Sequence, residues 1–119
     1  RRSSDLNSGI SFIGEHNFEA AVVGEVKPLL LMCMPRDDQF AEQVNIVMEA
    51  AAKYVGRLKV GLVDESFIGM FKKRYHVLGT PTFLILSQGR EKNRSLGLAD
   101  EQTITALISE VCLQNDKAV

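Results

Sequence analysis

The chain has 119 residues, of which 45% are hydrophobic and 24% charged, and its formal net charge at pH 7 is -1. This length and apolar fraction fit one packed globular domain and exclude a disordered or fibrous chain. The near-neutral charge argues against nucleic acid as a partner, since proteins that neutralise phosphates carry a clear basic excess. The longest apolar run, Leu29 to Met34, is far shorter than the ~20 residues that span a bilayer, so no membrane partner is expected.

The first third of the chain predicts two strands separated by a short helix. Residues 1–9 are polar and are expected to form a flexible lead-in, followed by a strand over 10–13. Apolar residues at helical spacing predict a helix over 17–23. Residues 29–34 are apolar at every position, which is typical of a strand buried on both faces in the middle of a sheet.

A long helix is predicted over residues 40–54. Pro35 ends the preceding strand, and Asp37 and Asp38 are suited to cap the helix and to face the positive end of its dipole. The apolar stripe expected to face the core consists of Phe40, Val44, Val47, Met48, Ala51 and Val55. The positions expected to face outward are Glu42, Gln43, Glu49 and Lys53.

The second half predicts a strand over 58–63, a short helix over 67–75, strands over 82–86 and 91–95, and a final helix that Asp100 caps. The short helix is expected to turn Phe67, Met70 and Phe71 inward. The inner stripe of the final helix is Ile104, Leu107, Ile108, Val111 and Cys112. The predicted class is therefore α/β, in the order β-α-β-α-β-α-β-β-α, with a mixed central sheet and helices on both faces. We expect a single domain over residues 10–115 and a tail over 116–119.

The cysteine and histidine patterns predict neither a metal site nor a cofactor. Cys33 and Cys112 form no C-x-x-C pair, and each lies in an apolar context that favours reduced core packing. A displaced single-thiol site at Cys33 is the alternative. His16 and His76 lack zinc-ligand spacing.

Several segments resemble the thioredoxin family along nearly the whole chain. They are residues 27–31 (KPLLL), 52–60 (AKYVGRLKV), 75–83 (YHVLGTPTF), the 87–89 turn (SQG) and Gly97. The resemblance implies a thioredoxin-like fold of the bacterial type and a cis peptide bond between Thr80 and Pro81.

The redox residues of that family do not match. Asp37 and Phe40 stand where the resemblance places the two active-site cysteines, and the chain has no Trp. Leu31 and Leu62 stand where the family has a buried acid and a lysine. Exchange of disulfides needs an activated thiolate and a second thiol two residues further on, so the expected protein is not an enzyme.

The resemblance then implies a redox-inactive domain that binds a protein or peptide, as a chaperone-like accessory or as a module of a larger chain. The expected groove consists of Met34, Arg36, Asp37, Phe40, Thr80, Pro81 and Leu98. The alternative is an atypical thiol-disulfide oxidoreductase that uses a single cysteine, and a third reading is a purely structural domain. The expected compartment is the cytoplasm, or the periplasm or another extracytoplasmic space if a signal segment has been removed.

Overall fold

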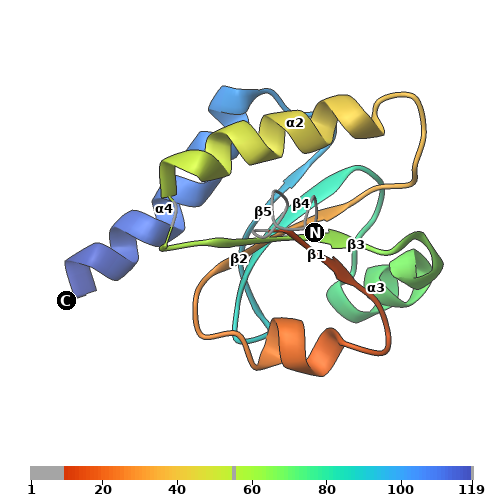
Figure 1. Ribbon diagram of the computed structural model, residues 1–119, viewed down its shortest axis with the longest axis horizontal. Helices are drawn as coiled ribbons and strands as arrows, with labels where there is room; N and C mark the ends of the chain where they lie inside the picture. The colour runs from red at the N-terminus through yellow and green to blue at the C-terminus, as the bar shows by residue number, and fades with distance from the viewer. Residues whose placement is uncertain (1–9, 55, 119) are drawn as a thin grey trace, which may run out of the picture.

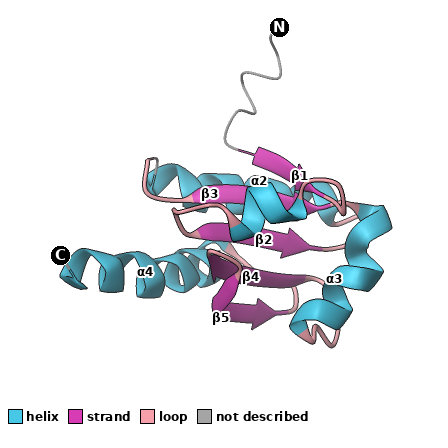
Figure 2. Ribbon diagram, turned by 90° about the horizontal axis from the view of Figure 1, so that it is seen from below, coloured by secondary structure: helices cyan, strands magenta, loops and turns pink. Residues whose placement is uncertain are grey.

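A five-stranded mixed sheet lies at the centre of the computed structural model, which describes residues 10–54 and 56–118 (Figure 1). Its strands are β1 (Ile10–Ile13), β2 (Leu29–Cys33), β3 (Lys59–Val63), β4 (Thr82–Ser87) and β5 (Arg90–Leu96). Figure 2 shows them side by side in the order β1-β3-β2-β4-β5. β1, β3 and β2 run parallel, while β4 is antiparallel to both β2 and β5. The predicted lead-in over residues 1–9 lies outside the described residues.

The central strand β2 is buried on both faces, as its unbroken apolar run predicts. All five of its residues are at most 3% exposed. Because side chains alternate along a strand, Leu30 and Met32 pack on one face of the sheet, and Leu29, Leu31 and Cys33 on the other. The sheet therefore separates two hydrophobic cores.

Helices cover each of the two faces (Figure 1). One face carries α2 (Phe40–Ala51), which continues as the 3-10 turn η2 (Ala52–Tyr54), together with α4 (Glu101–Ala118). The other carries the π-helical turn η1 (Glu19–Val23), the 3-10 turn η3 (Glu65–Phe67) and α3 (Ile68–Tyr75). The prediction of helices on both sides of a mixed sheet is confirmed.

The final helix agrees with its predicted stripe and cap. Its five stripe residues, from Ile104 to Cys112, are all buried. The Asp100 carboxylate accepts a hydrogen bond from the Thr103 backbone N–H at 2.8 Å, which satisfies one of the N–H groups at the helix start. The helix continues to Ala118, so most of the segment predicted as a tail is helical.

Two side chains face the opposite way from their predicted direction. Gln43 is buried and only 4% exposed, although a polar residue was expected to face solvent. Met70 is 53% exposed, because the short helix α3 turns Phe71 and Tyr75 into the core instead.

Val55, assigned to the inner stripe of the long helix, lies outside the described residues. The predicted helix over 17–23 is a shorter π-helical turn.

A two-residue turn connects β4 to β5. Gln88 and Gly89 both have positive φ, 51° and 86°, which matches the twist of an antiparallel hairpin. The Tyr75 hydroxyl donates a hydrogen bond to the Gly89 carbonyl at 2.8 Å and so joins the end of α3 to this turn. Hairpin and helix are therefore fixed to each other.

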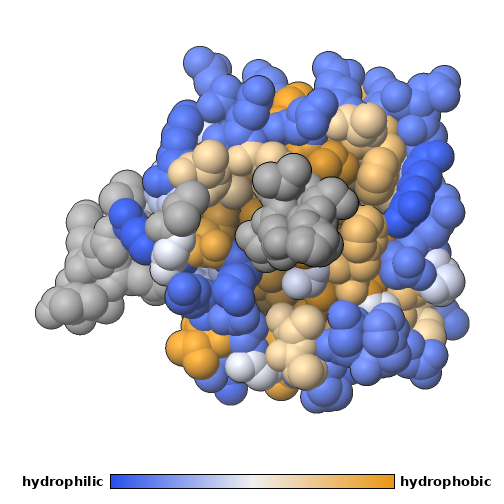
Figure 3. All heavy atoms as spheres, in the orientation of Figure 1, coloured by the Kyte–Doolittle hydropathy of each residue, from blue (hydrophilic) through white to orange (hydrophobic). Residues whose placement is uncertain are grey.

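The two edges of the sheet differ in charge. The outer strand β5 carries Arg90, Glu91, Lys92 and Arg94, and such charges discourage pairing with a further strand. β1 forms the opposite edge and contains no charged residue. Figure 3 shows the side on which β1 lies, with hydrophobic residues gathered towards the middle and hydrophilic residues around most of the rim.

Within the described ranges, no helix has the length and apolar character needed to cross a membrane.

Candidate binding surface beside Pro81

The segment that enters β4 brings several predicted site residues to one end of the sheet. The Thr80–Pro81 peptide bond is cis, with Thr80 exposed and Pro81 buried. The Thr82 hydroxyl donates to the Gly79 carbonyl at 2.6 Å, and the Gly97 N–H donates to the Pro81 carbonyl at 2.8 Å. These hydrogen bonds fix the entry of β4 against the end of β5.

Strand register explains why the groove residues meet here. Thr82 pairs with Cys33 on one side and with Leu96 on the other. Continued by one residue, the antiparallel register places Pro81 between Met34 and Gly97. Met34 itself is 2% exposed and belongs to the core against which Phe40 packs, so it supports this surface from below and does not reach solvent.

Three exposed leucines surround the same segment, and we call them the leucine rim. Leu78, Leu96 and Leu98 are 88%, 61% and 53% exposed. A Cβ built on Gly79 would lie 3.7 Å from Leu96 Cδ1, so Leu96 lies directly against the backbone next to Leu78. Of these three leucines, only Leu98 was among the predicted groove residues. In the sequence, Leu96 stands out as an apolar residue at the end of the otherwise polar segment 90–96, and this pattern could have indicated an exposed apolar site.

Arg36 is fixed at the neighbouring corner between α2 and β1. Its guanidinium carbon lies 5.2 Å from the Phe12 ring centroid and 5.5 Å from that of Phe40, which is cation–π distance. Its backbone N–H donates to the Glu65 carboxylate at 3.0 Å. Arg36 is exposed, so this corner presents a positioned guanidinium with the Glu65 carboxylate beside it. Neither Phe12 nor Glu65 was among the predicted site residues.

The predicted cap of the long helix takes a different form. Gln39 is the N-cap residue and makes no side-chain cap hydrogen bond. The Asp37 carboxylate accepts from the Gln39 N–H at 2.9 Å, two residues on, which is an Asx turn in front of the helix. Asp37 thus contacts the helix start, but neither Asp37 nor Asp38 is the N-cap, because the turn places them one residue or more too early.

The two cysteine side chains lie in the cores on opposite faces of the sheet. Cys33 is fully buried in the core under η1 and α3, whereas Cys112 is 2% exposed in the core under α2 and α4. Both are thiols, which confirms that they form no disulfide, and the sheet between them is the reason. Burial raises the pKa of the Cys33 thiol to about 11, and the charge of Lys72 only partly opposes this. Cys33 therefore holds its proton at neutral pH.

The described part of the chain contains no group of three or more His, Cys, Asp or Glu side chains placed to hold a metal ion. No family model matches the sequence, and the search of curated proteins finds no match either. The residues around Pro81 themselves are therefore the basis for a functional proposal.

Proposed function

We propose that this protein is a thioredoxin-like domain without redox activity that binds an extended protein or peptide segment beside Pro81. The sheet order β1-β3-β2-β4-β5, with helices on both faces, supports the fold that the sequence resemblance implies. Asp37 and Phe40 occupy the positions where that resemblance places the reactive cysteines. Because neither side chain can exchange disulfides, we propose binding and not redox chemistry at this end of the sheet.

The leucine rim is the observation that carries this proposal. Large exposed apolar side chains gathered around one loop are a feature of binding surfaces. In this proposal an extended segment pairs with the backbone of Thr80, an exposed residue, and places alternate side chains against Leu78 and Leu96. Arg36 at the neighbouring corner would favour an acidic residue in the same segment.

Catalysis by a single cysteine is the competing proposal, and the burial of the thiols weighs against it. Disulfide exchange starts with attack by an accessible thiolate. Cys33 is fully buried with a raised pKa, and Cys112 lies under the helices of the other face. An oxidoreductase built on either thiol would first have to open its core.

Fluorescence anisotropy with labelled, unstructured peptides tests the binding proposal. The peptides carry leucine at alternate positions and one glutamate, and a matched peptide has serine in place of leucine. We expect the protein to bind the leucine peptide but not the serine peptide. The double variant Leu78→Ser/Leu96→Ser should bind the leucine peptide about tenfold or more weakly. Val26, 76% exposed in the loop before β2, provides the control Val26→Ser, which should bind like the unchanged protein.

Two results would contradict the proposal. One is equal binding by the leucine-rim variant and the Val26 variant. The other is reduction of insulin disulfides by the unchanged protein, with loss of that activity in Cys33→Ala or Cys112→Ala, which would establish the single-cysteine enzyme instead.

A further inference from the structure

The outer edge of β1 has backbone groups with which no described strand pairs. Figure 2 shows β1 at the end of the sheet, and among the described residues only β3 pairs with it. The Ile13 carbonyl accepts a hydrogen bond from the Asp64 N–H, directly after β3, at 2.8 Å. Since the backbone groups of successive strand residues point to opposite sides, those of Ile10 and Phe12 face away from β3. Asn17 Nδ2 donates to the Phe12 carbonyl at 2.8 Å, which agrees with this outward direction.

An apolar hollow of about 320 Å³ adjoins this edge on the α2 side. Ile10 and Phe12 line it from β1, and Phe40 and Val44 line it from α2. Phe12 is 49% exposed, and its ring already lies against the Arg36 guanidinium. The hollow therefore fits an extended segment that pairs with β1 and places an apolar side chain beside Ile10.

The residues before β1 have the sequence of a hairpin that returns along this strand. Leu6 is followed by Asn7-Ser8-Gly9, and β1 begins at Ile10. A three-residue hairpin loop is typically a type I turn followed by a residue with positive φ, and glycine adopts positive φ most readily. Because loop length sets the register of a hairpin, a loop over 7–9 places Leu6 opposite Ile10. Two residues further along, Ser4 stands opposite Phe12.

We infer that residues 3–6 form a sixth strand, antiparallel to the outer edge of β1, with the Leu6 side chain in the hollow. In this register the Leu6 N–H donates to the outward Ile10 carbonyl, and the Phe12 N–H donates to the Ser4 carbonyl. Directly opposite side chains share a face of the sheet, and Ile10 packs against the core under α2, so Leu6 lies on the same face. The sixth strand takes the place of the flexible lead-in that composition alone predicts. The inference is independent of the function proposed for the leucine rim.

The polar residues of this segment fit the same register. Ser4 is small and leaves the Phe12 ring to Arg36, while Asp5 stands opposite the exposed Ser11 on the other face. Asp5 then puts a charge on the new edge strand, which discourages pairing with another chain. Covalent attachment also favours this segment over a second copy of the protein, because a short linker gives an effective concentration of about millimolar.

Disulfide cross-linking tests this register. Asp5 and Ser11 would form a non-hydrogen-bonded pair with Cα atoms about 4.5 Å apart, which a disulfide can span. In a glutathione redox buffer, mass spectrometry should find the intramolecular disulfide of Asp5→Cys/Ser11→Cys at least about tenfold more favoured than that of Ser4→Cys/Ser11→Cys, whose side chains point to opposite faces. Cys33 and Cys112 are buried and common to both variants. Equal disulfide formation in the two variants would overturn the register.

Hydrogen exchange and the oligomeric state separate this sixth strand from pairing between two copies of the protein. We expect a monomer in analytical ultracentrifugation. The Phe12 amide should exchange at least about tenfold more slowly than in Gly9→Val, since a β-branched residue resists positive φ. Ser8→Ala keeps the glycine and is the control, with exchange like that of the unchanged protein. Equal exchange in the unchanged protein and Gly9→Val, or protection of Phe12 that appears only on dimerisation, would overturn the inference.

Discussion

Gln43 and Ala99 exchange two hydrogen bonds across the core. Gln43 Nε2 donates to the Ala99 carbonyl at 3.1 Å, and the Ala99 N–H donates to Gln43 Oε1 at 3.0 Å. Both residues are buried, so neither backbone group of Ala99 is open to water. The pair joins α2 to the segment between β5 and α4, one residue after Leu98 of the leucine rim. A single polar side chain therefore helps to set the position of the proposed binding surface.

Gln43→Met should lower the free energy of unfolding by about 2 kcal/mol, because it leaves a buried N–H and a buried C=O without their partner. Urea unfolding followed by circular dichroism measures the change. Glu42→Met, at the exposed neighbouring position, is the control and should stay within about 0.5 kcal/mol of the unchanged protein. Equal losses in the two variants would contradict this role of the amide.

Cys33 should make stability depend on pH in the alkaline range. Burial raises its pKa from 9.0 to about 11, so above pH 9 the unfolded state loses this proton before the folded state does. The contribution is complete below pH 9 and is lost as the pH rises through 11, a total of about 2–3 kcal/mol.

Urea unfolding of the unchanged protein and of Cys33→Ala, between pH 9 and 11, measures this contribution as a difference. Burial also raises the pKa of Tyr75, but that residue is common to both proteins and cancels. The cavity left by the substitution should cost the same at every pH. Parallel stability curves across this range would show that Cys33 titrates normally.

Introducing a cysteine pair at the helix start should restore little redox activity. On the proposed thioredoxin-like fold, Asp37→Cys/Phe40→Cys has the required spacing at the start of α2. Leu31 and Leu62 cannot transfer protons, and general acid–base help of that kind contributes about 100-fold or more. We expect insulin reduction at least about 100-fold slower than by a thioredoxin. The control Asp37→Ser/Phe40→Ser should have none, and a rate near that of thioredoxin would show that these acid–base groups are dispensable.

Arg94→Lys should destabilise the end of α3 by about 1 kcal/mol. The Arg94 guanidinium donates to the Tyr75 carbonyl, to the His76 carbonyl at 3.2 Å, and to Glu91 at 2.7 Å. A lysine keeps the charge but cannot reach all three partners. Faster amide hydrogen exchange over residues 76–80 would reveal the effect, and Arg90→Lys on the same strand should show no change. Equal exchange in both variants would contradict it.

The predictable parts of the fold are those specified by local patterns. The unbroken apolar run of β2 and the i, i+3, i+4, i+7 stripe from Ile104 to Val111 each indicate an element and its buried face without reference to the rest of the chain. The Asp100 cap is equally local, because its partner is three residues away.

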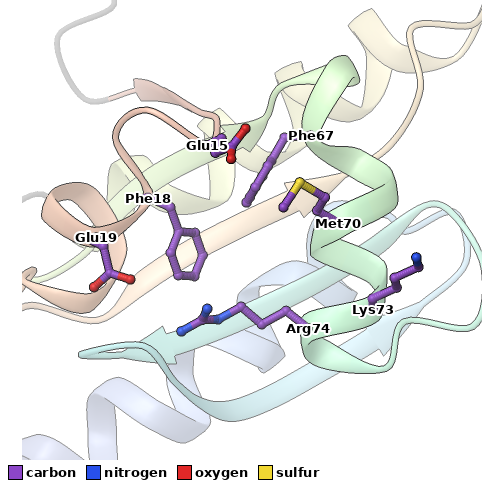
Figure 4. Close-up of a pocket in the computed structure, with 7 residues that line it drawn as sticks. All are labelled: Glu15, Phe18, Glu19, Phe67, Met70, Lys73 and Arg74. Atoms are coloured by element: carbon purple, nitrogen blue, oxygen red, sulfur yellow. The ribbon is translucent and has the colours of Figure 1, made fainter.

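The parts that sequence reasoning missed depend on partners far away in the chain. The partner of Gln43 lies 56 residues later, and nothing near Gln43 indicates that its amide is buried. Phe12, Arg36 and Phe40 come together only when β1 and α2 meet at one corner. The pocket that Phe18 and Met70 line (Figure 4) likewise forms only when η1 and α3 are both in place.

The position of β2 in the sheet has a consequence for synthesis of the chain. This strand is made early, but its partners β3 and β4 begin only at Lys59 and Thr82. Until both have left the ribosome, five consecutive apolar residues have unpaired backbone and exposed side chains, a segment prone to aggregation. The nascent chain is therefore most vulnerable to aggregation between the emergence of β2 and the emergence of β4 from the ribosome, and slower translation during that interval prolongs the exposure.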